Sequence, residues 1–214
     1  MEDISFSLEA LNELPSIKEQ KRYLNNTLKK IGNGSSRLVY RLNDETVLKF
    51  AKNENGIEQN EEEYSKSLSN TPIFAKVYDS DEDGKWIIME YGEPIKNIRV
   101  KQIYGVKFEN ISDFISLAFN DISSREKILI DVEPSSLKMY KDYIKWINNE
   151  STNSIKFTDK LGFFLKAICD YIKNNRSRKC DVMDWFAADN WGIANRNGEE
   201  CLVIIDMGLN ENLY

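Results

Sequence analysis

Oxygen-bearing side chains near the end of the chain have the chemistry of a metal site. Asp189 and Asn190 precede one apolar run and Asp206 follows another, with Asn197-Gly198 between the two runs. Asn-Gly in this position favours a tight hairpin, because both residues tolerate positive φ. Such a hairpin places Asn190 and Asp206 at the same end, where an amide oxygen and a carboxylate suit Mg²⁺ held jointly with phosphates. The alternative is a surface hairpin with polar ends.

A second set of residues with possible chemistry lies in the first third of the chain. Gly32 and Gly34 belong to a Gly- and Ser-rich turn, whose exposed N–H groups would favour an anion, although most such turns are only turns. Lys49 alternates with apolar neighbours, so its side chain leaves the expected strand on the opposite face. The run Glu61-Glu62-Glu63 is normally a solvated helix face, but one of the three could turn inward towards Lys49.

The composition excludes several classes of function. The chain has 214 residues and no histidine, which removes Ser-His-Asp and Cys-His catalysis and most zinc chemistry. The net charge of −6 argues against a nucleic-acid partner, and no apolar run approaches the roughly 20 residues of a membrane span. The acidic N-terminus is not a secretory signal, and three scattered cysteines predict no disulfide framework. We therefore expect a cytoplasmic protein with no nucleic-acid or membrane partner.

Hydrophobic periodicity predicts an α+β chain. We expect a short helix over residues 4–14 and then strands over 28–31, 37–42, 46–50, 74–78 and 86–91. Helices are expected over 57–68, 112–119 and 137–147, and one more begins at a Thr158 cap. The domain prediction is an N-terminal helical extension over 1–27, a β-rich lobe over 28–92 and a mainly helical lobe over 93–214, with the hairpin inside 180–209.

Taken in their order along the chain, six short motifs resemble those of the protein-kinase-like fold, including its small-molecule kinases. The matching stretches are GNGSSRLVY (32–40), VLKF (47–50), Glu63 within NEEEY, MEYG (89–92), DNWG (189–192) and IDMG (205–208). The resemblance spans residues 28–209, and its helical middle matches by position and not by motif. It implies a two-lobed fold, with an antiparallel β-sheet N-lobe and a mainly helical C-lobe.

The resemblance implies ATP and Mg²⁺ as cofactors, with nucleotide contacts in the first lobe. Gly32 and Gly34 would let the turn cover the phosphates. Lys49 would pair with the α- and β-phosphates and be held by a helix carboxylate, with Glu63 preferred and Glu62 as the alternative.

The remaining motifs imply adenine and metal contacts. Glu90 and Gly92 would offer backbone groups to the adenine edge, so that their side chains matter little. Asn190 and Asp206 would hold Mg²⁺ against the triphosphate. Lys49 and its helix partner are then expected to meet this metal pair in one crevice between the two lobes.

The expected catalytic base is displaced. Five residues before Asn190, where the family places its aspartate, this chain has Trp185, which cannot accept a proton. Asp184 is the preferred base, presented by a one-residue bulge, and Asp189 or Asp181 could substitute. A strict alignment therefore predicts a weakened or absent transferase.

Other departures concern the loop and the acceptor. Arg37 replaces the third glycine of the loop pattern. Only six residues follow Gly208, so we expect no activation segment and no peptide recognition of the ordinary kinase kind. Helices within 95–179 are expected to build a substitute acceptor site. Basic residues after the last helix could attract an anionic acceptor, although a basic helix end usually complements the helix dipole; they are Arg176, Arg178 and Lys179.

Three functions remain open. The first is an ATP- and Mg²⁺-dependent phosphotransferase with an unknown small-molecule or protein acceptor. The second is a nucleotide-binding pseudokinase or interaction module with a host or virion partner, which the displaced aspartate favours. The third is a structural protein that kept the fold without a ligand.

Overall fold

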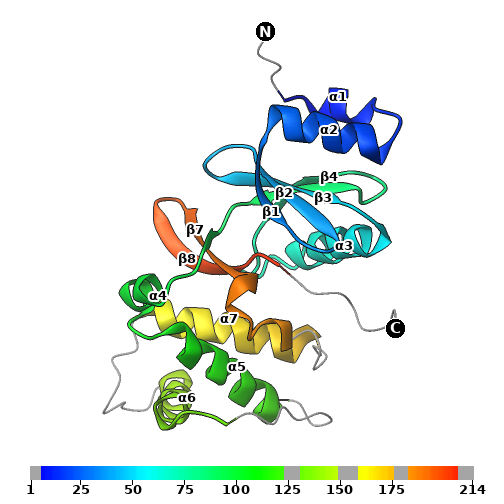
Figure 1. The fold of residues 1–214 in the computed structure, drawn as a ribbon. Coiled ribbons are helices and arrows are strands. Elements are labelled where there is room, and N and C mark those ends of the chain that lie inside the picture. The colour runs from blue at the N-terminus through cyan, green and yellow to red at the C-terminus, as the bar shows by residue number, and fades with distance from the viewer. Residues whose placement is uncertain (1–5, 123–130, 149–158, 176–182, 207–214) are drawn as a thin grey trace. The chain divides into compact units, whose positions relative to one another are not determined.

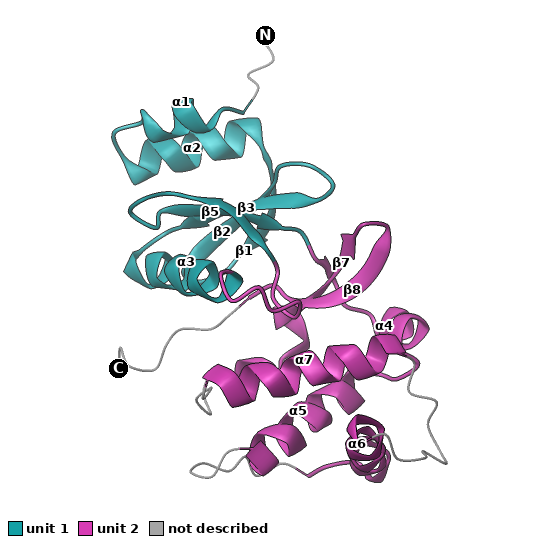
Figure 2. Cartoon of the chain, turned by 180° about the vertical axis from the view of Figure 1, so that it is seen from behind, with its two compact units in different colours: residues 1–67, 76–91 teal, residues 68–75, 92–214 magenta. Residues whose placement is uncertain are grey.

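The computed structural model describes residues 6–122, 131–148, 159–175 and 183–206 (Figure 1). Two compact units make up the chain, one formed by residues 1–67 and 76–91 and the other by 68–75 and 92–214 (Figure 2). The first unit contains α1 (Leu8–Asn12), α2 (Ile17–Thr27), β1 (Lys29–Asn33), β2 (Arg37–Arg41), β3 (Thr46–Ala51), α3 (Glu54–Ser67), β4 (Val77–Ser80) and β5 (Trp86–Glu90).

The second unit begins with the short strand β6 and ends with a hairpin. Its elements are β6 (Glu93–Pro94), α4 (Asn97–Tyr104), α5 (Phe108–Ile122), α6 (Pro134–Ile147), α7 (Asp159–Asn175), a 3₁₀ turn (Ala188–Asn190), β7 (Trp191–Arg196) and β8 (Glu199–Ile204). The α+β class is confirmed. A sheet unit with one helix between β3 and β4, followed by a mainly helical unit, is the element order of the protein-kinase-like fold that the sequence predicts.

The five strands of the first unit form an antiparallel sheet in the order β1-β2-β3-β5-β4. Leu48 and Phe50 on β3 pack with Leu11 of α1 and Leu24 of α2 in one buried cluster. Lys49 lies between Leu48 and Phe50 and therefore faces the other side of the sheet, which α3 covers (Figure 1). Strand β3 thus directs Leu48 and Phe50 towards α1 and α2, and Lys49, together with the buried Val47 and Ala51, towards the opposite face.

Helix α2 was not predicted by the apolar pattern. Of the helix expected over 4–14, the structure shows the shorter α1, and a second helix, α2, follows Pro15. Ser16 caps α2, because its Oγ accepts a hydrogen bond from the Glu19 N–H at 3.3 Å and donates to the Glu19 carboxylate at 2.8 Å. Both helices cover the sheet face that carries Phe50 (Figure 1).

The core of the second unit joins its helices to the hairpin. Its largest fully buried side chains include Trp185 and Trp191, which pack with residues from α4, α5 and α7. The expected strand over 74–78 is wrong at its start, since Phe74 forms a parallel bridge to Ile204 of β8 and β4 begins only at Val77. The ring centroids of Phe74 and Tyr171 are 4.8 Å apart. This packing in the core of the second unit explains why Phe74 is not part of the first sheet. Within the described ranges, no helix combines the length and apolar composition of a membrane span.

Candidate nucleotide and metal site

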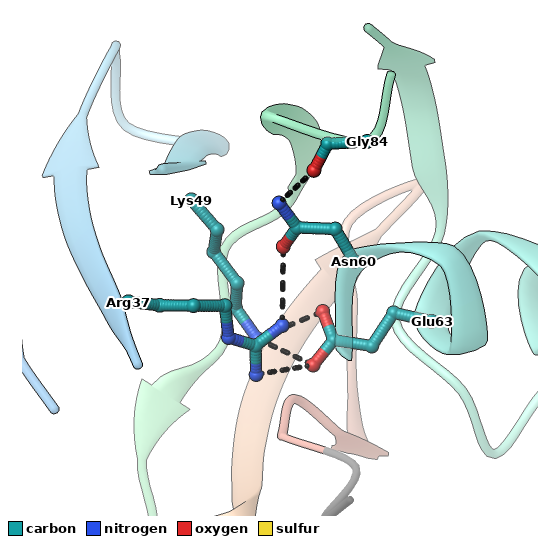
Figure 3. Close-up of polar contacts among 5 residues, drawn as sticks. All are labelled: Arg37, Lys49, Asn60, Glu63 and Gly84. Carbon is teal, nitrogen blue, oxygen red and sulfur yellow. Dashed lines mark hydrogen bonds and ion pairs between the residues drawn. The ribbon is translucent and has the colours of Figure 1, made fainter. Parts of the chain in front are cut away.

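Lys49 of β3 and Glu63 of α3 form a buried ion pair in the first unit (Figure 3). Lys49 Nζ lies 2.8 Å from Glu63 Oε1 and 2.9 Å from Oε2, and the two residues are 5% and 0% exposed. The neighbouring Glu62 instead pairs with Lys66 at 2.9 Å along the same helix. Of the two glutamates that the sequence left open, Glu63 is therefore the one in contact with Lys49.

Arg37 is a third charged member of this cluster, which the sequence motifs did not predict. Its Nη2 lies 2.8 Å from Glu63 Oε1, and its Nη1 donates to Asn60 Oδ1 at 3.3 Å. Strand register could have revealed it, because Val39 pairs with Lys49 and Arg37 lies two residues earlier on the same strand. Residues two apart on a strand share one face of the sheet, so Arg37 and Lys49 project towards α3 together.

The Gly-rich turn joins β1 to β2. Both Gly32 and Gly34 have ordinary negative φ, and a Cβ on Gly32 would lie 3.1 Å from the Val39 side chain. The Gly34 N–H, expected to be exposed to an anion, instead donates to the Arg37 carbonyl at 3.0 Å. Lys52 Nζ donates to the Gly34 carbonyl at 2.6 Å. The turn is thus held by its own neighbours, and the Gly34 N–H is already paired within the chain.

Glu90 is the last residue of β5 and is hydrogen-bonded to Lys76. Its N–H donates to the Lys76 carbonyl at 2.7 Å, and its carboxylate accepts from the Lys76 N–H at 3.2 Å. Tyr91 N–H donates to the Glu45 carbonyl at 2.7 Å. The buried Glu90 side chain therefore fixes the strand end, a contact that the sequence did not predict.

Gly92, the other expected adenine contact, belongs to the second unit. A Cβ on Gly92 would lie 2.6 Å from the Ile205 side chain and 2.9 Å from the Gly192 Cα. Next to it, Pro94 of β6 pairs with Gly192 of β7. The glycine of DNWG is thus required for a close backbone approach to the connector, since a side chain there would overlap the Gly92 backbone.

The predicted hairpin and its polar mouth are present in the second unit. Asn197 and Gly198 have φ of +56° and +82° between β7 and β8, so the Asn-Gly turn is confirmed. The N–H groups of Ile205 and Asp206 both donate to the Asn190 carbonyl, at 2.8 and 3.3 Å. Asn190 and Asp206 therefore lie together where the hairpin closes.

The hard-oxygen character of this mouth fits a magnesium ion. Asn190 Nδ2 donates to the Asp184 carbonyl at 2.8 Å, which orients the amide and keeps Oδ1 as its acceptor atom. Among the described residues no cluster of three or more His, Cys, Asp or Glu could hold a metal ion. Two protein oxygens with the remaining ligands from phosphates and water is the usual arrangement for Mg²⁺.

Trp185 is a core residue and not part of a reactive loop. It is 1% exposed, its ring packs against Phe74 and Tyr171, and its carbonyl accepts from Trp191 Nε1 at 2.7 Å. The adjacent Asp184 is half-buried, and Asp189 is exposed in the 3₁₀ turn.

The alternative base, the basic group after the last helix and the last glycine of IDMG lie outside the described residues. They are Asp181, Arg176, Arg178, Lys179 and Gly208, and the Thr158 cap lies outside as well.

Comparison with solved structures finds small-molecule kinases among the similar chains. A choline/ethanolamine kinase family protein from Mesorhizobium loti is 16% identical, with a TM-score of 0.39 over 96% of this chain and 66% of that chain. Choline kinase LicA from Streptococcus pneumoniae is 13% identical, with a TM-score of 0.36 over 88% of this chain and 67% of that chain. The aminoglycoside phosphotransferase APH(2″)-Ib, bound to ADP, is 16% identical, with a TM-score of 0.33 over 91% of this chain and 69% of that chain.

The chain thus spans about two thirds of the length of each of these structures. No protein-family model and no curated protein matches the sequence. With TM-scores below 0.5, the similar structures do not decide the function, which is inferred from the contacts of this chain.

Proposed function

We propose that this chain is an ATP- and Mg²⁺-dependent phosphotransferase with a protein-kinase-like fold, acting on a small-molecule or protein acceptor. The observation that carries the proposal is the buried contact between Lys49 and Glu63. In the phosphoryl-transfer template of this fold, a strand lysine contacts the nucleotide phosphates and a helix glutamate holds it in place.

Stability alone gives little reason for such a pair. Removing an ammonium and a carboxylate from water costs several kcal/mol per ion, and apolar residues of similar volume often serve a core equally well. Lys49 is nevertheless buried on a strand whose neighbours Leu48 and Phe50 are apolar. A role in holding phosphate gives a reason for the cation at this position.

The other roles follow the same template. Mg²⁺, when bound, would neutralise charge on the phosphates, and Asn190 Oδ1 and the Asp206 carboxylate would hold it. Gly32 and Gly34 would border the phosphates, and the backbone at Glu90 and Gly92 would border adenine. Asp184 would orient or deprotonate the acceptor, with Asp189 as the alternative. A cytoplasmic location and the absence of a nucleic-acid partner are part of this proposal.

A specific observation favours the second candidate, a nucleotide-binding pseudokinase. Trp185 occupies the position expected for the base, and its ring is committed to the core. A chain of this kind would bind nucleotide through Lys49 and the Asn190–Asp206 pair without transferring phosphate.

Turnover separates the two candidates. Purified wild-type protein and a Lys49→Met variant would be incubated with γ-labelled ATP and Mg²⁺, and phosphate release and transfer to added choline-like, aminoglycoside-like and protein acceptors would be measured. Phosphate release or transfer that depends on Lys49 supports the phosphotransferase. Saturable ATP binding without any turnover supports the pseudokinase, and no binding at all rejects both.

A further inference from the structure

Glu63 is shared between two cations from different strands (Figure 3). Its Oε1 accepts from Lys49 Nζ and from Arg37 Nη2, each at 2.8 Å, and its Oε2 accepts from Lys49 at 2.9 Å. All three residues are buried. The carboxylate that holds Lys49 is therefore itself held by Arg37, the residue that replaces the third glycine of the loop pattern.

Arg37 also reaches α3 at a second point. Its Nη1 donates to Asn60 Oδ1 at 3.3 Å, and Asn60 Nδ2 donates to the Gly84 carbonyl at 2.8 Å in the turn before β5 (Figure 3). Asn60 and Glu63 are three residues apart and so lie on the same face of the helix. The planar guanidinium can bridge an amide and a carboxylate at once, which the single ammonium of a lysine cannot do with the same geometry.

The first turn of α3 contacts the residue before Arg37. A Cβ on Gly56 would lie 2.4 Å from the Ser36 carbonyl, so the helix and the start of β2 approach as closely as backbones allow. Lys52 N–H donates to the same Ser36 carbonyl at 2.7 Å. Contacts at Gly56, Asn60 and Glu63 thus form one line along α3, all directed at residues 36 and 37.

We propose that Arg37 is a positioning residue for the nucleotide site. It acts through Glu63: by binding this carboxylate and Asn60, it keeps α3 against the sheet with Glu63 directed at Lys49, before any nucleotide is bound. The proposal rests on the proposed function for its consequence in ATP binding, but the positioning itself belongs to the free protein. Arg37 does not contact the phosphates in this account.

Hydrogen exchange in the nucleotide-free protein tests the positioning step. Arg37→Met removes the guanidinium but keeps an unbranched side chain, and Arg22→Met on the exposed face of α2 is the matched control. We expect amide exchange in residues 54–67 to become at least about tenfold faster in Arg37→Met, from the loss of charged hydrogen bonds, with α7 unchanged. Arg37→Lys should restore part of the protection, and it replaces Arg37→Met if that variant does not fold. If amides of α3 in Arg37→Met exchange as slowly as they do in the wild type, the proposal is overturned.

A double-mutant cycle on Mg·ATP affinity tests whether Arg37 acts through Lys49. We expect Arg37→Met to weaken binding about tenfold in the wild-type background and to have little further effect in a Lys49→Met background. Independent, additive losses would overturn the proposal, because they would place Arg37 on the phosphates directly. If the wild type binds no nucleotide, the proposed function fails, and the exchange experiment still decides the role of Arg37.

Discussion

Lys49 Nζ contacts both carboxylate oxygens of Glu63, and neither side chain is exposed to any extent that would hydrate its charge. Because Glu63 also neutralises Arg37, the carboxylate and the amine are not equivalent in the stability of the first unit. Removing the carboxylate leaves two buried cations facing each other. Removing the amine leaves Glu63 with its contact to Arg37.

The first prediction compares these two losses. We expect Glu63→Gln to lower the free energy of unfolding by about 3 kcal/mol or more, the cost of breaking a buried ion pair from one side. Lys49→Met should cost clearly less, because the Arg37 contact remains. Urea unfolding followed by circular dichroism measures both. An equal loss of unfolding free energy in the two variants would show that Arg37 does not balance the charge of Glu63 when Lys49 is removed.

The second prediction concerns the approach of Gly192 to Gly92. A Cβ on Gly192 would lie 2.7 Å from the Gly92 Cα, where only backbone atoms could move aside. Gly192→Ala should therefore destabilise the second unit by about 1 to 3 kcal/mol, the usual cost of overpacking. Gly34→Ala is the control for stability, since a Cβ on Gly34 would lie 3.7 Å from the nearest atom, the Arg37 carbonyl oxygen. A Gly192→Ala protein as stable as Gly34→Ala would contradict the close approach.

The third prediction assigns the base. If Asp184 serves the acceptor, Asp184→Asn should lower turnover by about 10²-fold or more while ATP affinity changes little, because the Asp184 backbone carbonyl still holds Asn190. Asp189→Asn is the matched comparison from the exposed 3₁₀ turn. Steady-state kinetics and calorimetric ATP titration separate kcat from affinity. Unchanged turnover in Asp184→Asn with a loss in Asp189→Asn would reverse the assignment.

The fourth prediction is a loss of stability at alkaline pH. Burial raises the pKa of the Tyr104 hydroxyl to about 12 and the pKa of the Cys169 thiol from 9.0 to about 11. A raised pKa means that the folded chain holds its proton longer than the unfolded chain, so the stability is complete below about pH 9 and falls as pH rises through 11.

Denaturation at several pH values measures this slope. Cys169→Ala should flatten the decline between pH 9 and 11, and the exposed Tyr64→Phe should leave it unchanged. An equally steep decline in Cys169→Ala would mean that other groups cause it.

Local patterns were sufficient to predict two parts of the structure. Asn197-Gly198 predicted the hairpin because positive φ is a property of those two residues, and it also brought Asn190 and Asp206 to one end. Alternation along β3 predicted the face on which Lys49 lies. In both cases the deciding interactions are set within a few residues of the chain.

Other parts depend on contacts between distant residues. Arg37 meets Glu63 across 26 positions, and only the register of β2 with β3 and the packing of α3 bring them together. Phe74 is not part of its expected strand, because its ring packs against Tyr171 in the core of the second unit. Helix α2 is different, since the Ser16–Glu19 cap was readable in the sequence and the apolar pattern alone did not show it.

The most direct test of the central claim is the thermal stability of the protein with Mg·ATP. We predict a rise of about 5 to 10 °C for the wild type at a ligand concentration of about 100 Kd, and a much smaller rise for Lys49→Met or Asp206→Asn. Lys66→Met, which removes the partner of Glu62 on the same helix as Glu63, should respond like the wild type. The same rise in Lys49→Met and Asp206→Asn as in the wild type, or no rise in the wild type, would contradict the nucleotide site.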